Sequence, residues 1–276
     1  MGGVGKTTLA KLAYNDVRLE GHFDFKAWVC VSEEFDVIKI TKTILDSIAG
    51  HIGDVNDLNM LQVKLKEKLL RKKFLFVLDD IWTENPSDWS LLRYPFEVGS
   101  PESKIIITTR NEVISTMMGT LPAYSLKELS DEACLRIFTQ YALGTTDFSL
   151  HEHLKEIGEK IVKKCNGLPL AAEILGGLLR GKPNSNAWGG VLNSRVWDLP
   201  EEKSNILPAL RVSYFFLPSH LKRCFAYCSV FPKDYEFLKE EIILLWMAEG
   251  LLQNNKKQME DLGNEFFHDL KSSVGF

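Results

Sequence analysis

The chain has 276 residues, of which 45% are hydrophobic and 25% charged, as is ordinary for a soluble globular protein with one large domain or a few smaller ones. Its formal net charge of −4 argues against broad, non-specific binding to nucleic acid. Its longest apolar candidate for a membrane span, Leu168 to Leu179, is interrupted by Glu173 and two glycines and falls short of the ~18–20 residues that a span needs.

The chain begins with a glycine-rich loop, and a helix is predicted over 6–14. The loop matches the phosphate-binding pattern G-x-x-x-x-G-K-[ST] except for its first glycine, which would stand immediately before Met1. In this pattern glycines let backbone N–H groups converge on phosphate oxygens, Lys6 reaches the β- and γ-phosphates, and the Thr7 hydroxyl binds Mg²⁺. The predicted helix would turn the positive end of its dipole toward the same anion. The residues assigned to the nucleotide are Gly2, Gly3, Val4, Gly5, Lys6, Thr7 and Thr8.

A phosphate-binding loop normally follows a buried strand, and no such strand precedes Met1 in this sequence. We therefore expect the sequence to be a piece of a longer protein, with the first strand of its sheet missing. Without that strand, the edges of neighbouring strands, including Phe74–Leu78, are expected to be exposed and prone to aggregation.

Strands and helices alternate in the first part of the chain. A β-rich run covers 26–31, helical spacing covers 36–48 and 58–70, and continuous apolar runs cover Phe74–Leu78 and Ile105–Ile107. Continuous apolar strands of this kind are typical of a parallel sheet that is buried on both faces. The alternation with helices predicts a three-layer α/β domain.

After Leu126 the pattern becomes helical, and no strand is predicted for most of the remaining sequence. A polar break is expected at 183–186. The predicted helices cover 130–143, 154–164, 168–179, 205–214, 218–229, 239–251 and 259–270. A region of roughly 150 residues is expected to form two subdomains.

Two acidic residues, Asp79 and Asp80, follow the first continuous apolar run. Open parallel sheets place ligand-binding groups at such strand ends. We expect Asp79 to hold the Mg²⁺ that it shares with Thr7. Asp80 is a candidate for orienting or activating a water molecule. The other interpretation is a strand-ending turn with two solvated acids, and this alternative stays open for Asp80.

Arg110 ends the second continuous apolar run. An arginine there could reach the γ-phosphate of a bound triphosphate and report its presence. The alternative is an arginine that caps a helix or pairs with an acid at the surface.

Two further features are weaker signals. Pro169 suits the first turn of the helix that follows it, and by itself it marks only a helix start. Cys224 and Cys228 lie four residues apart on a predicted helix, where buried structural thiols are expected rather than a metal site. The five cysteines have no framework spacing and no signal peptide is visible, so a reducing cytoplasmic setting is favoured, with a nuclear one left open.

Six segments, taken in order, resemble the NB-ARC domain of plant intracellular immune receptors with nucleotide-binding and leucine-rich-repeat regions. The segment Phe23–Ser32 and the tryptophan Trp82 are similar to the coiled-coil subclass rather than the Toll/interleukin-receptor subclass. The segments are the loop 2–8, the run 23–32, the Walker B motif 76–82, the sensor strand 104–110, the GLPL motif 165–171 and the run 224–232.

The resemblance implies a switch of the STAND group of P-loop NTPases. Such proteins hold ADP in a closed resting state, exchange it for ATP on activation, and then form oligomers. The implied fold is a P-loop NTPase parallel sheet followed by all-helical ARC subdomains, the last of them a truncated winged-helix-like unit. The implied domains are 1–127, 128–196 and 197–276. The implied partners are the nucleotide, the coiled-coil and leucine-rich-repeat domains outside this sequence, and further copies of the same protein.

The resemblance also assigns roles to single residues. Lys6 and Thr7 bind phosphates and Mg²⁺, Asp79 supports Mg²⁺, and Asp80 aids slow ATP hydrolysis. The resemblance makes two further assignments. Arg110 senses the γ-phosphate, and Pro169 packs near the adenine.

One family motif, Met-His-Asp, is not found in this sequence. His268-Asp269-Leu270 resembles it superficially, and we interpret this run as an ordinary helical segment. Two other functions stay open. The first is a turnover enzyme, either an ATPase or a small-molecule kinase, and a kinase would need an acceptor pocket and a lid. The second is a STAND transcription regulator, which would need a DNA-reading element. We see no segment that predicts any of these parts.

Overall fold

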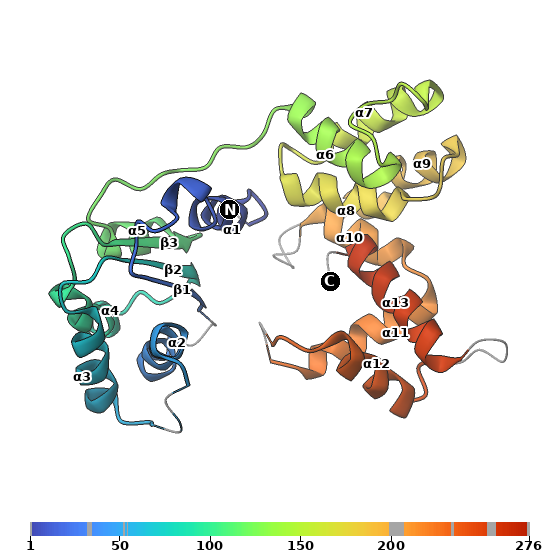
Figure 1. Cartoon of the computed structure of the whole chain (residues 1–276). Helices are drawn as coiled ribbons and strands as arrows, with labels where there is room; N and C mark the ends of the chain where they lie inside the picture. Colours follow the sequence, from blue (N-terminus) through green and yellow to red (C-terminus); the bar gives the residue numbers. More distant parts are fainter. Residues whose placement is uncertain are drawn as a thin grey trace. The chain divides into compact units, whose positions relative to one another are not determined.

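The computed structural model describes residues 2–31, 35–51, 53, 55–198, 207–232, 235–252 and 258–274. The chain divides into two compact units, Met1–Leu126 and Lys127–Phe276 (Figure 1). Among the described residues, no helix combines the length and the apolar character needed to cross a membrane.

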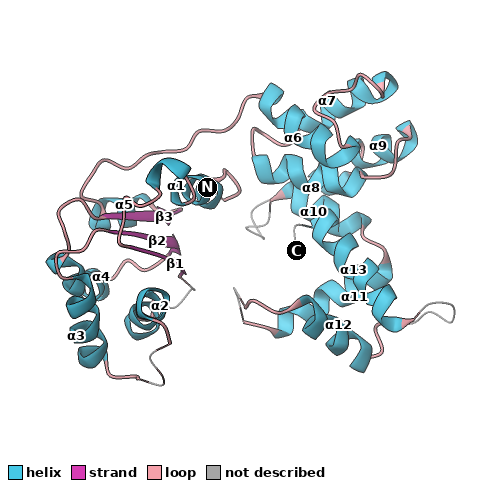
Figure 2. Ribbon diagram, in the orientation of Figure 1, coloured by secondary structure: helices cyan, strands magenta, loops and turns pink. Residues whose placement is uncertain are grey.

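A three-stranded parallel sheet forms the centre of the first unit, with the strand order β1-β2-β3 (Figure 2). The strands are β1 (Phe25–Cys30), β2 (Phe74–Ile81) and β3 (Lys104–Thr109). All three were predicted, and the α/β class is confirmed. One prediction is wrong: Phe74–Leu78 exposes no edge, because β2 is the middle strand and pairs with β1 on one side and β3 on the other.

Four helices of the first unit, α2 to α5, start where short polar side chains cap them. Asp36 and Asp57 accept hydrogen bonds from the first turns of α2 and α3, and Asn85 and Asn111 do the same for α4 and α5. Such caps satisfy backbone N–H groups that have no acceptor within the helix. The helices are α1 (Lys6–Tyr14), α2 (Val37–Ala49), α3 (Leu58–Leu69), α4 (Pro86–Arg93) and α5 (Glu112–Met118), with short 3-10 helices η1 (Val17–Leu19) and η2 (Tyr94–Val98).

The two faces of the sheet bury different parts of the sequence. Phe76 and Leu78 of β2 belong to one hydrophobic cluster with Ile44 of α2 and Leu65 of α3. Successive side chains of a strand point to opposite faces, so Val77 and Asp79 face the other way. On that other face α1 packs against β2 and β3. This packing brings the glycine-rich loop to the end of β2 that carries the acids.

The second unit is helical, and no strand occurs among the residues described in it. The buried helix α8 contacts α6, α10 and α13, and so lies at the centre of the unit. The helices are α6 (Asp131–Leu143), α7 (Lys155–Lys163), α8 (Pro169–Leu179), α9 (Ser185–Leu192), α10 (Pro208–Phe216), α11 (Ser219–Tyr227), α12 (Lys239–Ala248) and α13 (Met259–Val274), with 3-10 helices η3 (Glu152–Leu154), η4 (Arg195–Asp198) and η6 (Cys228–Val230).

Most predicted helices of this unit are confirmed to within a few residues at their ends. Ser130 caps α6 as expected and accepts from the Ala133 N–H at 3.2 Å. The polar break at 183–186 is wrong in part, because α9 begins at Ser185 and is capped by Asn184. Residues 205 and 206 of the predicted helix 205–214 lie outside the described residues, and α10 is seen from Pro208.

A test of the second unit's packing uses two helical glycines. A Cβ at Gly158 of α7 would overlap the Phe148 ring and lie 3.1 Å from the Trp188 ring. We expect Gly158→Ala to lower the free energy of unfolding by about 1–3 kcal/mol, because both rings are held in a packed core. A Cβ at Gly190 of α9 meets nothing within 4 Å. Gly190→Ala should therefore raise that free energy by about 0.5–1 kcal/mol. Denaturant unfolding that gave both variants the same sign would contradict this packing.

Candidate functional site

The glycine-rich loop turns sharply before α1. Gly3 has a φ of 74° and Gly5 a φ of 97°, a left-handed conformation that glycine adopts at little cost. Gly5 occupies the position before the first helical residue, Lys6. No side chain caps α1, and the N–H groups of its first turn point toward its N-terminal end, where the loop lies. Loops and helix starts of this kind bind anions.

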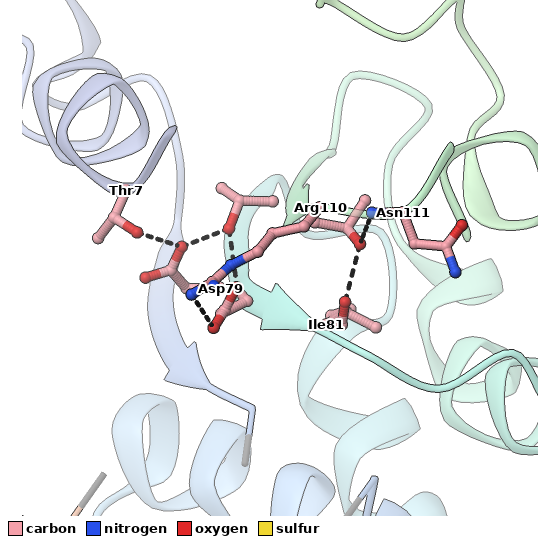
Figure 3. Close-up of polar contacts among 8 residues, drawn as sticks. Thr7, Asp79, Ile81, Arg110 and Asn111 are labelled. Carbon is pink, nitrogen blue, oxygen red and sulfur yellow. Dashed lines mark hydrogen bonds and ion pairs between the residues drawn. The ribbon is translucent and has the colours of Figure 1, made fainter. Parts of the chain in front are cut away.

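The carboxylate of Asp79 joins the loop to the sheet. Asp79 lies in β2 and is buried, with 5% of its surface exposed. Its Oδ1 accepts a hydrogen bond from the Thr7 hydroxyl at 3.0 Å (Figure 3). The Thr108 hydroxyl of β3 donates to the same oxygen. Segments that are 72 residues apart in sequence therefore meet at one carboxylate.

Asp80 lies at an irregularity of the sheet. The pairing of β2 with β3 shifts register between Leu78 and Ile81, and Asp80 has a φ of 57°. We predicted that the strand stops at Leu78, but β2 continues through both acids to Ile81. A bulge of this kind redirects side chains, and bulges are common beside active sites. As a result, the two neighbouring acids have different surroundings.

Arg110 directly follows β3 and lies beside Asp80. Its Nη2 is 3.4 Å from Asp80 Oδ2, and its guanidinium carbon is 5.0 Å from the centroid of the Trp82 ring. A Cβ at Gly2 would lie 3.2 Å from Arg110 Nη1, so the guanidinium is also next to the loop. The Arg110 side chain is 45% exposed. Exposed ion pairs contribute little to stability, so Arg110 can leave Asp80 for a more strongly charged anion.

Lys6 is half-buried among these charges. Partial burial is the main reason that its pKa is lowered, and the positive charge of Arg110 lowers it further. The negative charges of Asp80 and Asp79 act in the opposite direction. A bound polyphosphate would place negative charge between two cations that repel each other. The electrostatics of the site therefore favour an anionic ligand.

The magnesium ligands predicted from the sequence fit the chemistry of that ion. Thr7 and Asp79 offer a hydroxyl oxygen and a carboxylate oxygen 3.0 Å apart. Magnesium prefers oxygen ligands and is commonly held by one or two protein side chains together with phosphate and water. Among the described residues there is no group of three or more His, Cys, Asp or Glu side chains that could hold a metal ion, so such a site would depend on Thr7 and Asp79 together with phosphate and water.

The family to which the chain belongs follows from comparison with known proteins. A model of the NB-ARC domain matches residues 1–147, just over half of the sequence. The chain belongs to the NB-ARC family. A model of the disease resistance protein winged helix domain matches residues 230–274. The predicted fold class, a P-loop parallel sheet followed by helical ARC and winged-helix parts, is thereby confirmed.

The NB-ARC chain is similar to curated plant proteins along nearly its whole length. Putative disease resistance RPP13-like protein 1 of Arabidopsis thaliana is 49% identical over 276 residues, which cover 99% of this chain and 26% of that protein. Disease resistance protein RGA2 of Solanum bulbocastanum is 47% identical over 273 residues, which cover 98% and 28%. The chain spans about a quarter of the length of these relatives.

The other residues singled out in the sequence lie in ordinary surroundings. Pro169 occupies the first position of α8 in the second unit, and its role near the adenine stays a prediction. Cys224 is buried and Cys228 is half-buried, and burial raises the pKa of their thiols to about 11 and about 12. The Cys228 thiol donates to the Cys224 carbonyl at 3.2 Å. His268 lies on the exposed side of α13.

Two residues of the site in the NB-ARC chain were not assigned from the sequence. Thr108 was included only within the sensor strand 104–110, and Trp82 was noted only as a mark of a subclass. The signal for Thr108 is its place at the carboxyl end of a strand that pairs with the strand of Asp79. The signal for Trp82 is weaker, because its contact with Arg110 depends on how two strand ends turn.

Proposed function

We propose that this NB-ARC chain is the ADP/ATP-binding switch of a plant intracellular immune receptor of the coiled-coil subclass. In this proposal nucleotide exchange drives a conformational change and oligomerisation. The observation that carries it is the contact between Thr7 of the loop and Asp79 of β2, with Arg110 beside them. The NB-ARC match and the names of the plant relatives support a nucleotide-binding domain of a disease resistance protein.

Each residue of the site has a role in the proposal. Lys6 binds the β- and γ-phosphates, and Arg110 senses the γ-phosphate by exchanging Asp80 for it. Thr7 and Asp79 hold Mg²⁺, which neutralises phosphate charge when it is bound. Asp80 aids slow hydrolysis. The backbone N–H groups that surround the phosphates come from Gly2, Gly3, Val4, Gly5, Lys6, Thr7 and Thr8.

In this proposal nucleotide exchange moves the helical subdomains of the second unit. We propose a nucleotide-binding domain over 1–127, a first helical ARC subdomain over 128–196, and a second over 197–276. Pro169 at the start of α8 packs near the adenine. The coiled-coil and leucine-rich-repeat domains are proposed partners, as are further copies of the protein, and the proposed location is the cytoplasm or the nucleus.

A comparison of ATP turnover with nucleotide release tests whether the protein is a switch or an enzyme. We expect ADP to remain bound for longer than one hydrolysis event takes, so that release limits each cycle. Stopped-flow release of a fluorescent ADP and single-turnover hydrolysis of ATP give the two rates on one sample. Rapid multiple turnover with weakly held ADP would favour a turnover ATPase instead.

The affinity for ADP should depend on pH through Lys6. The pKa of Lys6 is lowered in the free protein, and bound phosphates should raise it. Affinity is then constant below the pKa of the free form and falls as the pH rises through it, because deprotonated Lys6 attracts no anion. Titrations with ADP from about pH 7 to about pH 10 measure this fall. The fall should be absent from Lys6→Met, and an equal fall in that variant would assign it to another group.

A further inference from the structure

One hydroxyl group contacts both acids of the site. The Thr108 Oγ1 accepts a hydrogen bond from the backbone N–H of Asp80 at 2.9 Å and donates one to Asp79 Oδ1. Thr108 lies near the end of β3 and is buried, with 6% of its surface exposed. We infer that Thr108 is a positioning residue of the nucleotide site, which fixes the Asp79 carboxylate for Mg²⁺. This inference rests on the proposed function.

The irregularity of β2 explains why such a hydroxyl is needed. The register shift between Leu78 and Ile81 interrupts the ladder of hydrogen bonds at Asp80. Asp80 also has a positive φ of 57°, which is uncommon for residues other than glycine. The Thr108 hydroxyl takes the N–H that the interrupted ladder leaves there. It thereby stabilises the bulge, which leaves Asp79 beside Thr7 and Asp80 beside Arg110.

The direction of the hydrogen bonds is fixed by the chemistry of a hydroxyl. A threonine hydroxyl has one hydrogen and two acceptor lone pairs. Since Thr108 accepts from the Asp80 N–H, its hydrogen is available for the Asp79 carboxylate. The Thr7 hydroxyl donates to the same Oδ1. Two donors therefore fix one oxygen of the Asp79 carboxylate, which sets the orientation of the whole group.

The neighbouring threonine provides a matched control. The Thr109 hydroxyl donates to the Ile81 carbonyl at 2.8 Å and accepts from the Asn111 N–H at 3.1 Å. It therefore has the same bonding pattern on the same strand, but neither partner is an acid of the site. Figure 3 shows these partners, Ile81 and Asn111, apart from the contact of Thr7 with Asp79. A Thr109→Val variant loses a structural hydroxyl without changing what holds the Asp79 carboxylate.

The inference is tested by the gain in ADP affinity that Mg²⁺ causes. Calorimetry measures this gain as the ratio of the affinities with Mg²⁺ and with EDTA. The sample is the chain or a longer protein that contains it. We expect Thr108→Val to lower this gain about fivefold to tenfold and to leave the affinity in EDTA within about twofold. The loss is smaller than a whole hydrogen bond to a carboxylate contributes, because the Thr7 hydroxyl still donates to the same oxygen. Thr108→Ser keeps the hydroxyl and should keep the gain. Thr109→Val should also keep it.

A second comparison, made in the Asp79→Asn variant, separates a loss of carboxylate positioning from general damage to the fold. In Asp79→Asn the carboxylate is gone, so adding Thr108→Val should lower the gain no further. Thermal unfolding without nucleotide checks that each variant is folded. If Thr108→Val does not fold, Thr108→Ala and Thr108→Ser give the same comparison with and without the hydroxyl.

The outcomes distinguish the inference from the function on which it rests. Wild-type protein that binds no ADP would overturn the proposed function, and the inference with it. Wild-type protein whose gain from Mg²⁺ is unchanged in Thr108→Val overturns the inference alone. A loss in Thr109→Val as large as that in Thr108→Val also overturns it, because the effect would then come from the strand end and not from the acid.

Discussion

Lys6→Ala is expected to weaken the binding of ADP and ATP about 10- to 100-fold. Lys6 begins α1 at the glycine-rich loop and lies close enough to Arg110, Asp80 and Asp79 for their charges to act on it. Its charge would form hydrogen bonds with phosphate oxygens, and bonds of this kind contribute on the order of 1.5–3 kcal/mol. Isothermal titration calorimetry measures the change.

The matched control for this prediction is Lys11→Ala. Lys11 lies on the same helix, in its last turn, and is exposed. Its removal changes the net charge by the same amount, so we expect ADP to bind the Lys11 variant as it binds the wild type. Unchanged affinity in Lys6→Ala, or equal losses in both variants, would show that Lys6 does not contact the phosphates.

Asp79→Asn and Asp80→Asn are expected to affect different steps. The buried Asp79 carboxylate lies 3.0 Å from the Thr7 hydroxyl, whereas the half-buried Asp80 carboxylate faces Arg110. Asp79→Asn should weaken ADP binding in Mg²⁺ about tenfold or more, because an amide is a poor ligand for this hard cation. Asp80→Asn should leave that affinity near the wild-type value and chiefly slow the hydrolysis of ATP.

Two measurements on the same samples check this separation. Calorimetry with Mg²⁺ and with EDTA gives the magnesium dependence of binding, and single-turnover hydrolysis gives the rate of the chemical step. Thermal unfolding without nucleotide shows whether Asp79→Asn remains folded after it loses its charge. If Asp80→Asn abolishes the effect of Mg²⁺ and Asp79→Asn retains it, the two roles are reversed.

The strands and most helices could be predicted because local patterns determine them. The order of the strands could not, because hydrophobicity gives Phe74–Leu78 and Ile105–Ile107 similar patterns without showing which is central. The end of β2 was misplaced for a related reason. Acids disfavour strands, but hydrogen bonds from Thr7 and Thr108 hold Asp79 within the sheet.

The helix α9 shows how tertiary packing overrides local propensity. Its first two residues fall within the polar break predicted at 183–186, and its two adjacent glycines also disfavour a helix. The structure buries Trp188 of this helix against Phe138 and Phe148, with ring centroids 5.2 Å and 6.1 Å away. Contacts with residues distant in sequence thus stabilise a helix that its own residues favour only weakly.

The residues of the candidate site that belong to motifs with a known physical mechanism could be predicted from the sequence. The loop pattern pointed to Lys6 and Thr7, and the acid after an apolar run pointed to Asp79. The part played by Thr108 depends on the pairing of Ile81 with Thr109 and on the bulge before it. Those features arise from register, which no single segment of the sequence specifies.

In the proposed function, the presence of a γ-phosphate changes the assembly state of this protein. Sedimentation velocity with ADP and with a non-hydrolysable ATP analogue, on the chain or on a longer protein that contains it, is the decisive measurement. We predict a smaller species with ADP and a larger one with the analogue, and we predict that Arg110→Ala abolishes the difference. Identical sedimentation with both nucleotides in the wild type, with both shown to be bound, would contradict the claim.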